Sequence, residues 1–230
     1  MIKALIFDKD GTLFDFRATW SAWAGRALED LAGGDAARLA HMADALGYDL
    51  ETRDFLPTSS VIAGTVEEQA ENLATLLPEM SVAQITERLN TLALTVVQVE
   101  VTPLGPFLAS LKADGYLLGL ATNDAESSAR AHLASVGALD AFDFIAGYDS
   151  GFGGKPAPGQ LLAFIDVTGL EPASIAMVGD STHDLAAARA AGMVGAGVLT
   201  GPAGEAQLAG LADVVLPSIV ELPAWLATSR

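Results

Sequence analysis

Short apolar runs that alternate with helical patterns constrain this chain more than any other feature. The runs are typical of buried strands, and they lie at residues 2–7, 116–121, 144–146, 175–178, 194–199 and, more weakly, 213–216. Helical periodicity falls between them, at about 103–114, 125–136, 158–169, 182–191 and 204–211. Glycines follow four of these patterns: Gly115, Gly137, Gly169 and Gly192. This alternation predicts an α/β fold with a doubly wound parallel sheet covered by helices on both faces.

Residues 17–98 differ from the rest because they contain only helical patterns. These patterns lie at about 18–32, 35–46, 65–77 and 81–97. Asp35 and Ser81 are suitable N-caps, since a short polar side chain there accepts a hydrogen bond from the first turn. We therefore expect an all-helical domain at 17–98, inserted into an α/β domain made of residues 1–16 and 99–230.

Composition excludes several classes of protein. Of the 230 residues, 51% are hydrophobic and 18% are charged, which is typical of a globular chain. The formal net charge of −17 repels nucleic acids and anionic membranes, so neither is an expected partner. No cysteine is present, which excludes disulfides and thiolate catalysis. No stretch approaches the roughly 20 apolar residues of a membrane span, and the apolar run before Asp8 is too short for a signal peptide, so we expect a cytoplasmic protein.

Two acids, Asp8 and Asp10, stand where the first predicted strand ends. Residues two apart in an extended segment point the same way, so both carboxylates can face one small volume. Two carboxylates this close repel unless a cation lies between them or one of them is protonated. The pair is either a capping cluster in a turn or, as we favour, part of a reactive site.

Three further segments follow the other predicted strands. Gly179–Asp184 carries Asp180 and Asp184 before a helix, where acids also serve as N-caps. Thr122-Asn123 follows the run 116–121 and offers either a cap or a phosphate-binding hydroxyl. Lys155 lies in a glycine-rich loop, where a lysine is either solvated or, held by the flanking prolines, able to neutralise a nearby anion.

Together these segments place acids, a hydroxyl and a lysine at one edge of the sheet, where ligands bind in folds of this class. In-line phosphoryl transfer to a carboxylate needs such a set: a nucleophile, a metal, a proton donor and groups that hold the phosphoryl oxygens. Known phosphate and calcium loops do not fit, since glycine falls at the wrong position after Asp8 for an EF-hand and Pro156 replaces the hydroxyl residue of a P-loop.

The same segments resemble those of the haloacid dehalogenase superfamily of aspartate-nucleophile hydrolases, and most of all the phosphoglycolate phosphatase branch. The matching stretches occur in the family's order: Asp8–Leu13, Thr122-Asn123, Asp149–Pro158 and Gly179–Asp184. The resemblance implies a Rossmann-like core, and it implies that the helical insert is the family's cap domain. It also implies a phosphatase that hydrolyses a small phosphate monoester through an aspartyl-phosphate.

The resemblance assigns a role to each matched residue. It implies that Asp8 attacks phosphorus and that Asp10 protonates the leaving group and then activates water. It implies that Thr122, Asn123 and Lys155 bind the phosphoryl oxygens. Mg²⁺ is the implied cofactor, with the ligands Asp8, the Asp10 backbone carbonyl, Asp180 and, close by or in an outer position, Asp184.

Several alternatives within and outside the family remain to be weighed. A dehalogenase has no use for Asp10, and a phosphonate hydrolase needs a cap lysine that 17–98 lacks. A phosphomutase acting on a sugar phosphate keeps both acids and stays open, as does a non-catalytic binding module. Arg17, near the cap hinge, is the candidate for recognising a substrate carboxylate.

Three residues depart from the expected pattern. Lys9 stands where many relatives carry an apolar residue, and it either assists an anionic substrate or, as we favour, is a solvated side chain. Asp124 adds a negative charge at a position that is often basic in relatives, which counts against a direct phosphoglycolate assignment. His132 is expected on the surface of its helix, while the place of His183 is left open.

Overall fold

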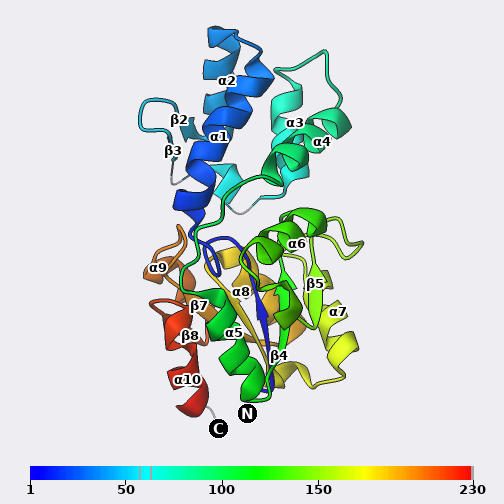
Figure 1. Ribbon diagram of the computed structural model, residues 1–230, viewed down its shortest axis with the longest axis vertical. Coiled ribbons are helices and arrows are strands. Elements are labelled where there is room, and N and C mark those ends of the chain that lie inside the picture. The colour runs from blue at the N-terminus through cyan, green and yellow to red at the C-terminus, as the bar shows by residue number, and fades with distance from the viewer. Residues whose placement is uncertain (57, 63, 229–230) are drawn as a thin grey trace. The chain divides into compact units, whose positions relative to one another are not determined.

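The computed structural model describes residues 1–56, 58–62 and 64–228, and the chain forms two compact units. The core unit comprises Met1–Phe16 and Gln98–Arg230, and the inserted unit comprises Arg17–Val97 (Figure 1). Within the described ranges, none of the helices is long and apolar enough to cross a membrane.

The core unit contains a six-stranded sheet in the order β5-β4-β1-β6-β7-β8, and every pair of neighbours is parallel. Its strands are β1 (Ala4–Phe7), β4 (Leu117–Ala121), β5 (Phe144–Ala146), β6 (Ile175–Gly179), β7 (Val194–Val198) and β8 (Val214–Leu216). All six predicted runs are confirmed as strands. The predicted α/β fold with a doubly wound parallel sheet is therefore confirmed.

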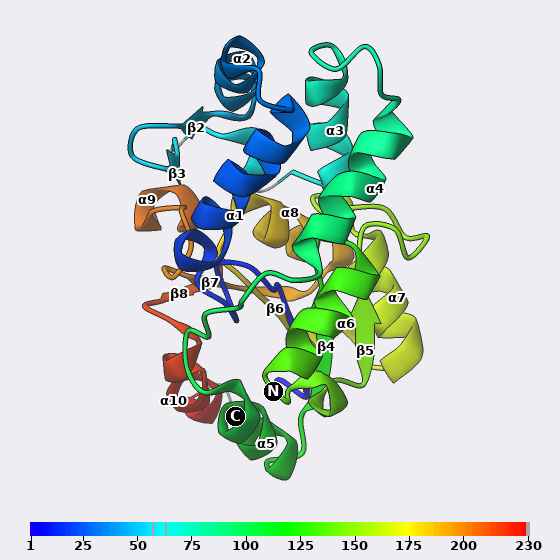
Figure 2. The same cartoon turned by 45° about the horizontal axis from the view of Figure 1, so that its top comes forward.

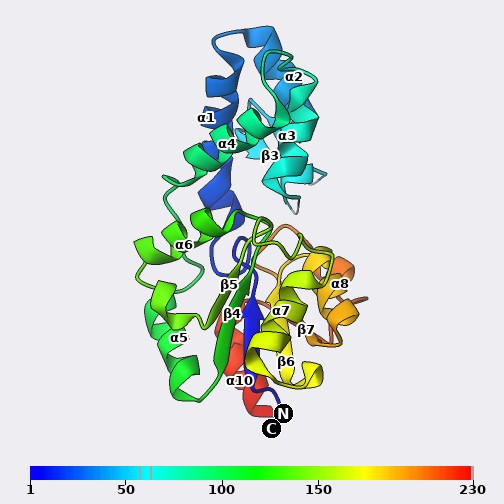
Figure 3. The same cartoon turned by 90° about the vertical axis from the view of Figure 1, so that its right-hand side faces the viewer.

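Helices cover both faces of the sheet because successive side chains of a strand point to opposite sides. Leu5 and Phe7 of β1 pack in one apolar cluster with α5, α6 and α10, whereas Ala4 and Ile6 pack in a second with α7 and α8. Figure 3 shows α5 and α6 on one side of the strands and α7 and α8 on the other, and Figure 2 shows the same helices from another direction. The helices of the core unit are α5 (Leu104–Ala113), α6 (Glu126–Ser135), α7 (Gly159–Thr168), α8 (Thr182–Ala191), α9 (Glu205–Leu208) and α10 (Leu222–Thr228), with short 3₁₀ turns η2 (Leu139–Ala141), η3 (Pro172–Ser174) and η4 (Ile219–Glu221).

The strand order reverses between β1 and β6. The chain runs from β1 outward through β4 to β5, then returns to β6 on the other side of β1. Phe7 pairs with Val178, and the Asp8 N–H donates to the Val178 carbonyl at 2.8 Å. The residues that follow β1 and β6 therefore leave the sheet side by side, at the kind of crevice where doubly wound sheets bind ligands.

The inserted unit is mostly helical. Its elements are α1 (Phe16–Ala32), α2 (Ala36–Leu46), β2 (Tyr48–Asp49), β3 (Asp54–Phe55), η1 (Ser60–Ile62), α3 (Val66–Ala74) and α4 (Val82–Ala93). Asp35 and Ser81 cap α2 and α4 as predicted, each accepting backbone N–H bonds of the first turn.

The expectation of helices alone in this unit is corrected by one small hairpin. β2 and β3 are antiparallel, with Tyr48 opposite Phe55 and their ring centroids 5.4 Å apart. The turn between them is polar: the Asp49 carboxylate accepts from the N–H groups of Glu51 and Thr52, and Arg53 has a φ of 54°. Two-residue strands are too short to display alternating hydrophobicity, so the pattern carried no strand signal.

The two chain connections to the inserted unit are paired with each other inside the core unit. The Asp15 N–H donates to the Val99 carbonyl at 2.8 Å, and the Val101 N–H donates to the Leu13 carbonyl at 3.0 Å. The chain thus leaves the core unit and re-enters it along adjacent backbone segments.

Candidate active site

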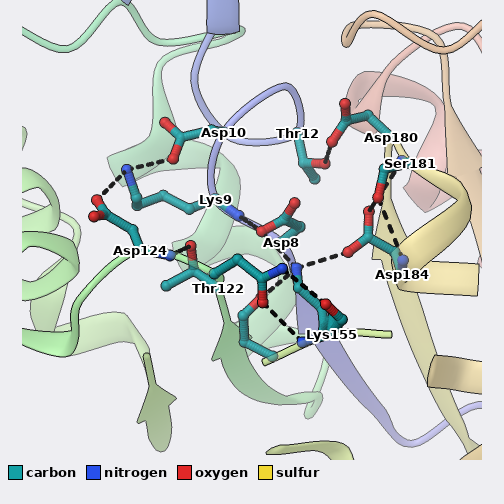
Figure 4. Close-up of polar contacts among 12 residues, drawn as sticks. Asp8, Lys9, Asp10, Thr12, Thr122, Asp124, Lys155, Asp180, Ser181 and Asp184 are labelled. Carbon is teal, nitrogen blue, oxygen red and sulfur yellow. Dashed lines mark hydrogen bonds and ion pairs between the residues drawn. The ribbon is translucent and has the colours of Figure 1, made fainter. Parts of the chain in front are cut away.

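The predicted site residues of the core unit lie at the carboxyl edge of its sheet. Asp8 follows β1, Thr122 follows β4 and Asp180 follows β6, while Lys155 lies in the loop between β5 and α7. Figure 4 shows Asp8, Lys155 and Asp184 joined by ion pairs, with Asp180 beside them. Four segments far apart in sequence therefore meet because their strands are parallel and adjacent.

The Lys155 ammonium group is the centre of this arrangement. It lies 2.7 Å from Asp8 Oδ1 and 2.6 Å from Asp184 Oδ1, and it donates to the Ala121 carbonyl at 2.8 Å. Only 5% of Lys155 is exposed. Burial alone lowers the pKa of Lys155, but the charges of Asp184 and Asp8 outweigh it and raise that pKa, so the side chain stays cationic.

Asn123 holds the loop that carries Lys155. Its side-chain NH₂ donates to the Lys155 carbonyl at 2.9 Å, and its side-chain oxygen accepts from the Lys155 N–H at 2.8 Å. The Thr122 hydroxyl, in turn, accepts from the Asp124 N–H at 3.1 Å, and Thr122 is 2% exposed. The Thr-Asn pair after β4 thus orders the backbone around the site, and its predicted contact with phosphate stays a prediction.

Asp184 is placed by the start of α8. Ser181 is the N-cap, and the Asp184 Oδ2 atom accepts from the Ser181 N–H at 3.0 Å and from its hydroxyl at 2.7 Å. The capping box thereby fixes one oxygen of the fully buried Asp184, and the other oxygen meets Lys155. The same residue thus takes part both in the capping of α8 and in the ion pair with Lys155.

Asp180 lies in a close-fitting space made by two glycines. A Cβ atom on Gly201 would lie 1.7 Å from Asp180 Oδ2, and one on Gly11 would lie 2.4 Å from the same atom. Gly11 also has a φ of 77°, which favours glycine. The Thr12 hydroxyl donates to Asp180 Oδ1 at 3.3 Å. The backbone thus approaches this carboxylate from two sides.

Three carboxylates form a group that suits a divalent cation. Asp8, Asp180 and Asp184 each offer an oxygen, and these atoms lie within 4.8 Å of one another. Burial is the main cause that raises the pKa of Asp8 to about 7, and burial with the charges of Asp184 and Asp8 raises the pKa of Asp180 well above its ordinary value. Lys155 offsets only part of this negative charge, so the donor set fits a hard, oxygen-loving ion.

Lys9 and His132 are not on the surface, so both expectations are wrong. Lys9 is fully buried, with its Nζ atom 2.7 Å from Asp10 Oδ2 and 3.3 Å from Asp124 Oδ2. His132 is 1% exposed, and its Nδ1 atom is 3.2 Å from Lys9 Nζ. Asp124 is the partner of a buried lysine, which the sequence pattern did not indicate.

Arg17 belongs to the inserted unit, where it pairs with the carboxylate of Asp54 on β3. It also donates to the Phe55 carbonyl at 3.4 Å. Its predicted contact with a substrate stays a prediction.

Sequence reasoning missed Thr12, Gly11 and Gly201 as supports of Asp180. A signal existed for Gly201, because it follows the end of β7, at the same carboxyl edge as the other site residues. The need for a glycine at this position becomes clear only from the structure, in which Asp180 fills the space that a side chain would take.

The comparisons with known proteins agree with this geometry. The sequence model of the haloacid dehalogenase-like hydrolases matches residues 2–192. The chain belongs to this family. The resemblance inferred from the motifs is therefore confirmed.

Curated relatives of the chain carry one name repeatedly. The phosphoglycolate phosphatase of Rhodospirillum rubrum is 42% identical over 86 residues, covering 37% of this chain and 36% of that protein. The phosphoglycolate phosphatase of Chromobacterium violaceum is 39% identical over 115 residues, covering 50% of this chain and 51% of that protein. The matches thus span about half the length of these relatives or less.

A solved structure with a similar fold is CbbY from Rhodobacter sphaeroides in complex with phosphate. It has a TM-score of 0.69 and 24% identity, and the match covers 96% of each chain. At this identity the likeness supports the haloacid dehalogenase-like fold across both units of the chain.

The ion pairs of Lys155 predict how stability depends on pH in the metal-free protein. The pKa of Asp8 is about 7 in the folded protein, against an ordinary value of 3.8. The free energy of unfolding of the wild type therefore falls as the pH rises from 3.8 to about 7, and this contribution of Asp8 is constant above pH 7. In Lys155→Met the pKa of Asp8 rises further, so stability continues to fall above pH 7. We expect the variant to lose about 3–5 kcal/mol at pH 8.5 and clearly less at pH 6, measured by urea denaturation. An equal loss at both values would contradict this reading of the ion pairs.

The space around Asp180 predicts a glycine requirement. Gly201→Ala should displace Asp180 and lower the affinity for Mg²⁺ or Mn²⁺ at least about tenfold, measured by calorimetric titration. Gly204→Ala is the matched control, since its added Cβ would have only the Gln207 side chain within 4 Å, at 3.8 Å. Equal metal affinity in the two variants would show that Asp180 does not hold the ion.

Proposed function

We propose that this chain is a Mg²⁺-dependent phosphatase that hydrolyses a small phosphate monoester through an aspartyl-phosphate on Asp8. The observation that carries this proposal is the position of Asp8. One of its oxygens lies 2.7 Å from the Lys155 ammonium, and the carboxylates of Asp180 and Asp184 complete a group within 4.8 Å. This is the environment that an anionic nucleophile needs beside an anionic substrate.

The group of carboxylates supports a metal as part of this function. The residues that would hold Mg²⁺ are Asp8, Asp180 and the Asp10 backbone carbonyl, with Asp184 close by. A bound Mg²⁺ would supply positive charge that stabilises the phosphoryl oxygens and favours ionised Asp8 over the protonated form that burial promotes. The chain's own contribution is to keep the carboxylates together before the ion arrives, through Lys155, the α8 capping box and the glycines around Asp180.

The remaining residues divide the work on the substrate. Asp8 attacks phosphorus, and the bond to the leaving oxygen breaks as the bond to Asp8 forms. Asp10 gives its proton to that oxygen and then removes a proton from the water that attacks the aspartyl-phosphate, which regenerates Asp8. Thr122 and Asn123 bind the phosphoryl oxygens by hydrogen bonds, and Lys155 binds them through its positive charge.

The nucleophile can be tested directly. Asp8→Asn should reduce Mg²⁺-dependent release of phosphate from p-nitrophenyl phosphate by at least about 10³-fold, because an amide does not form the phosphoenzyme. The control Asp114→Asn removes an exposed carboxylate just past α5 and should leave the rate unchanged. Substantial turnover by a folded Asp8→Asn variant would show that the aspartyl-phosphate mechanism is wrong.

The same assay separates the phosphatase from the phosphomutase alternative. With a hexose phosphate as substrate, a phosphatase releases inorganic phosphate, whereas a mutase yields an isomeric sugar phosphate. Phosphorus NMR distinguishes these products, and net isomerisation without phosphate release would overturn the proposed activity.

The substrate class is proposed from the relatives and from the inserted unit. Relatives named phosphoglycolate phosphatase suggest an ester that carries a carboxylate, such as 2-phosphoglycolate. Arg17, the first residue of the inserted unit, is the proposed partner of that carboxylate.

This role for Arg17 predicts a selective effect on binding. Arg17→Ala should raise KM for 2-phosphoglycolate about tenfold or more and change KM for p-nitrophenyl phosphate little, because only the first ester carries a carboxylate. Arg38→Ala is the control, since Arg38 also forms an ion pair within the inserted unit, with Glu79. Similar changes in KM for both esters in Arg17→Ala would remove Arg17 from substrate recognition.

A further inference from the structure

A second buried lysine, Lys9, has no part in the function described so far. It lies between the nucleophile Asp8 and the proposed proton donor Asp10 in sequence, yet its side chain extends away from Asp8. Figure 4 shows its ammonium group between Asp10 and Asp124. The distances are 2.7 Å to Asp10 Oδ2 and 3.3 Å to Asp124 Oδ2, and the Lys9 side chain is 0% exposed.

A buried ammonium group persists only where opposite charges and hydrogen bonds replace water. Burial lowers the pKa of Lys9, but the charges of Asp10 and Asp124 outweigh it and raise that pKa. Lys9 is therefore a cation held between the carboxyl groups of Asp10 and Asp124. Since the side chain has no exposed surface, it is unsuited to bind a phosphate that arrives from solvent.

Lys9, Asp10, Asp124 and His132 form a cluster, and Asp124 is held in place by backbone hydrogen bonds. Asp124 Oδ1 accepts from the Ala125 N–H at 2.9 Å, and the Asp124 carbonyl accepts from the Tyr148 N–H at 3.1 Å. His132, on α6, lies 3.2 Å from Lys9 Nζ and 3.9 Å from Asp124 Oδ2. The Lys9 ammonium group is thus held by Asp124, in the loop before α6, and by His132, on α6 itself, whereas Asp10 lies in the loop after β1.

We propose that Lys9 is a positioning residue for Asp10: it binds the Oδ2 atom of Asp10 and so orients the other carboxyl oxygen, Oδ1, which carries the proton that is transferred. This inference rests on the proposed function, in which Asp10 protonates the leaving oxygen. Asp124 and His132 act one step further away, by holding Lys9. A proton donor on a loop gains from such a support, because a displacement of about 1 Å can cost about 10²-fold in rate.

Two esters that differ in their need for a proton test this role. Phenyl phosphate has a poor leaving group that requires protonation, whereas p-nitrophenyl phosphate has a leaving group that departs without it. The parameter kcat/KM reports the steps up to departure of the leaving group, so the later hydrolysis of the phosphoenzyme does not enter. Lys9→Met should lower kcat/KM about 10–100-fold for phenyl phosphate and less than about 3-fold for p-nitrophenyl phosphate.

Controls separate positioning from a general loss of folded protein. Lys112→Met makes the same substitution at a partly exposed lysine that pairs with Asp143, and it should change neither ester. Because Lys9→Met leaves the buried Asp124 without its cation, the double variant Lys9→Met/Asp124→Asn is measured as well. Asparagine there still accepts the Ala125 N–H bond, and the double variant should keep the unequal effect on the two esters. Thermal melting monitors the fold of each variant.

The outcomes distinguish this inference from the proposed function. If folded Lys9→Met and the double variant lose equal activity on both esters, or none, Lys9 only packs the core and the inference is overturned. The phosphatase mechanism would still stand on the Asp8→Asn result. If the wild-type protein releases no phosphate from either ester in the presence of Mg²⁺, the proposed function fails and the role of Lys9 fails with it.

Discussion

The contact of the Lys155 ammonium with two carboxylates and a backbone carbonyl is the interaction around which the site is built. Asp8 comes from the end of β1, Asp184 from the first turn of α8 and the Ala121 carbonyl from β4. One cation therefore joins three separate elements of the core unit. Without it, buried negative charges would face one another across the crevice between β1 and β6, and breaking such a pair is strongly destabilising.

The second buried lysine gives the pair Asp8 and Asp10 an asymmetry that their sequence spacing alone does not explain. Asp8 is bound by Lys155 on one side, and Asp10 is bound by Lys9 on the other. Two carboxylates two residues apart thus have different cations and different surroundings. Proteins assign distinct roles to neighbouring acids in this way, by environment instead of by residue type. The proposed division between attack and proton transfer, which comes from the family resemblance, agrees with this difference.

The sheet and the meeting of its carboxyl-end residues could be predicted from the sequence, because apolar runs of three to six residues and their order leave few topologies. Contacts among polar residues were harder to foresee. Lysine and histidine are residue types that usually lie on the surface. Lys9 and His132 are buried because both lie beside Asp124, which is far from Lys9 in the chain. The hairpin at Tyr48–Phe55 was missed because strands of two residues carry no periodicity. Gly201 was missed because the sequence does not show that Asp180 occupies the space where a Cβ atom of residue 201 would lie.

The paired backbone at Asp15 and Val99 has a consequence for how such a chain can evolve. Since the chain leaves and re-enters the core unit along hydrogen-bonded neighbours, the core holds both ends of the insertion at a fixed, short separation. A folded module whose own termini lie close together could occupy that position without altering the sheet. Domain insertions are tolerated at sites of this kind. The core unit and the inserted unit can therefore change independently, the first by point substitution and the second by exchange of a whole module.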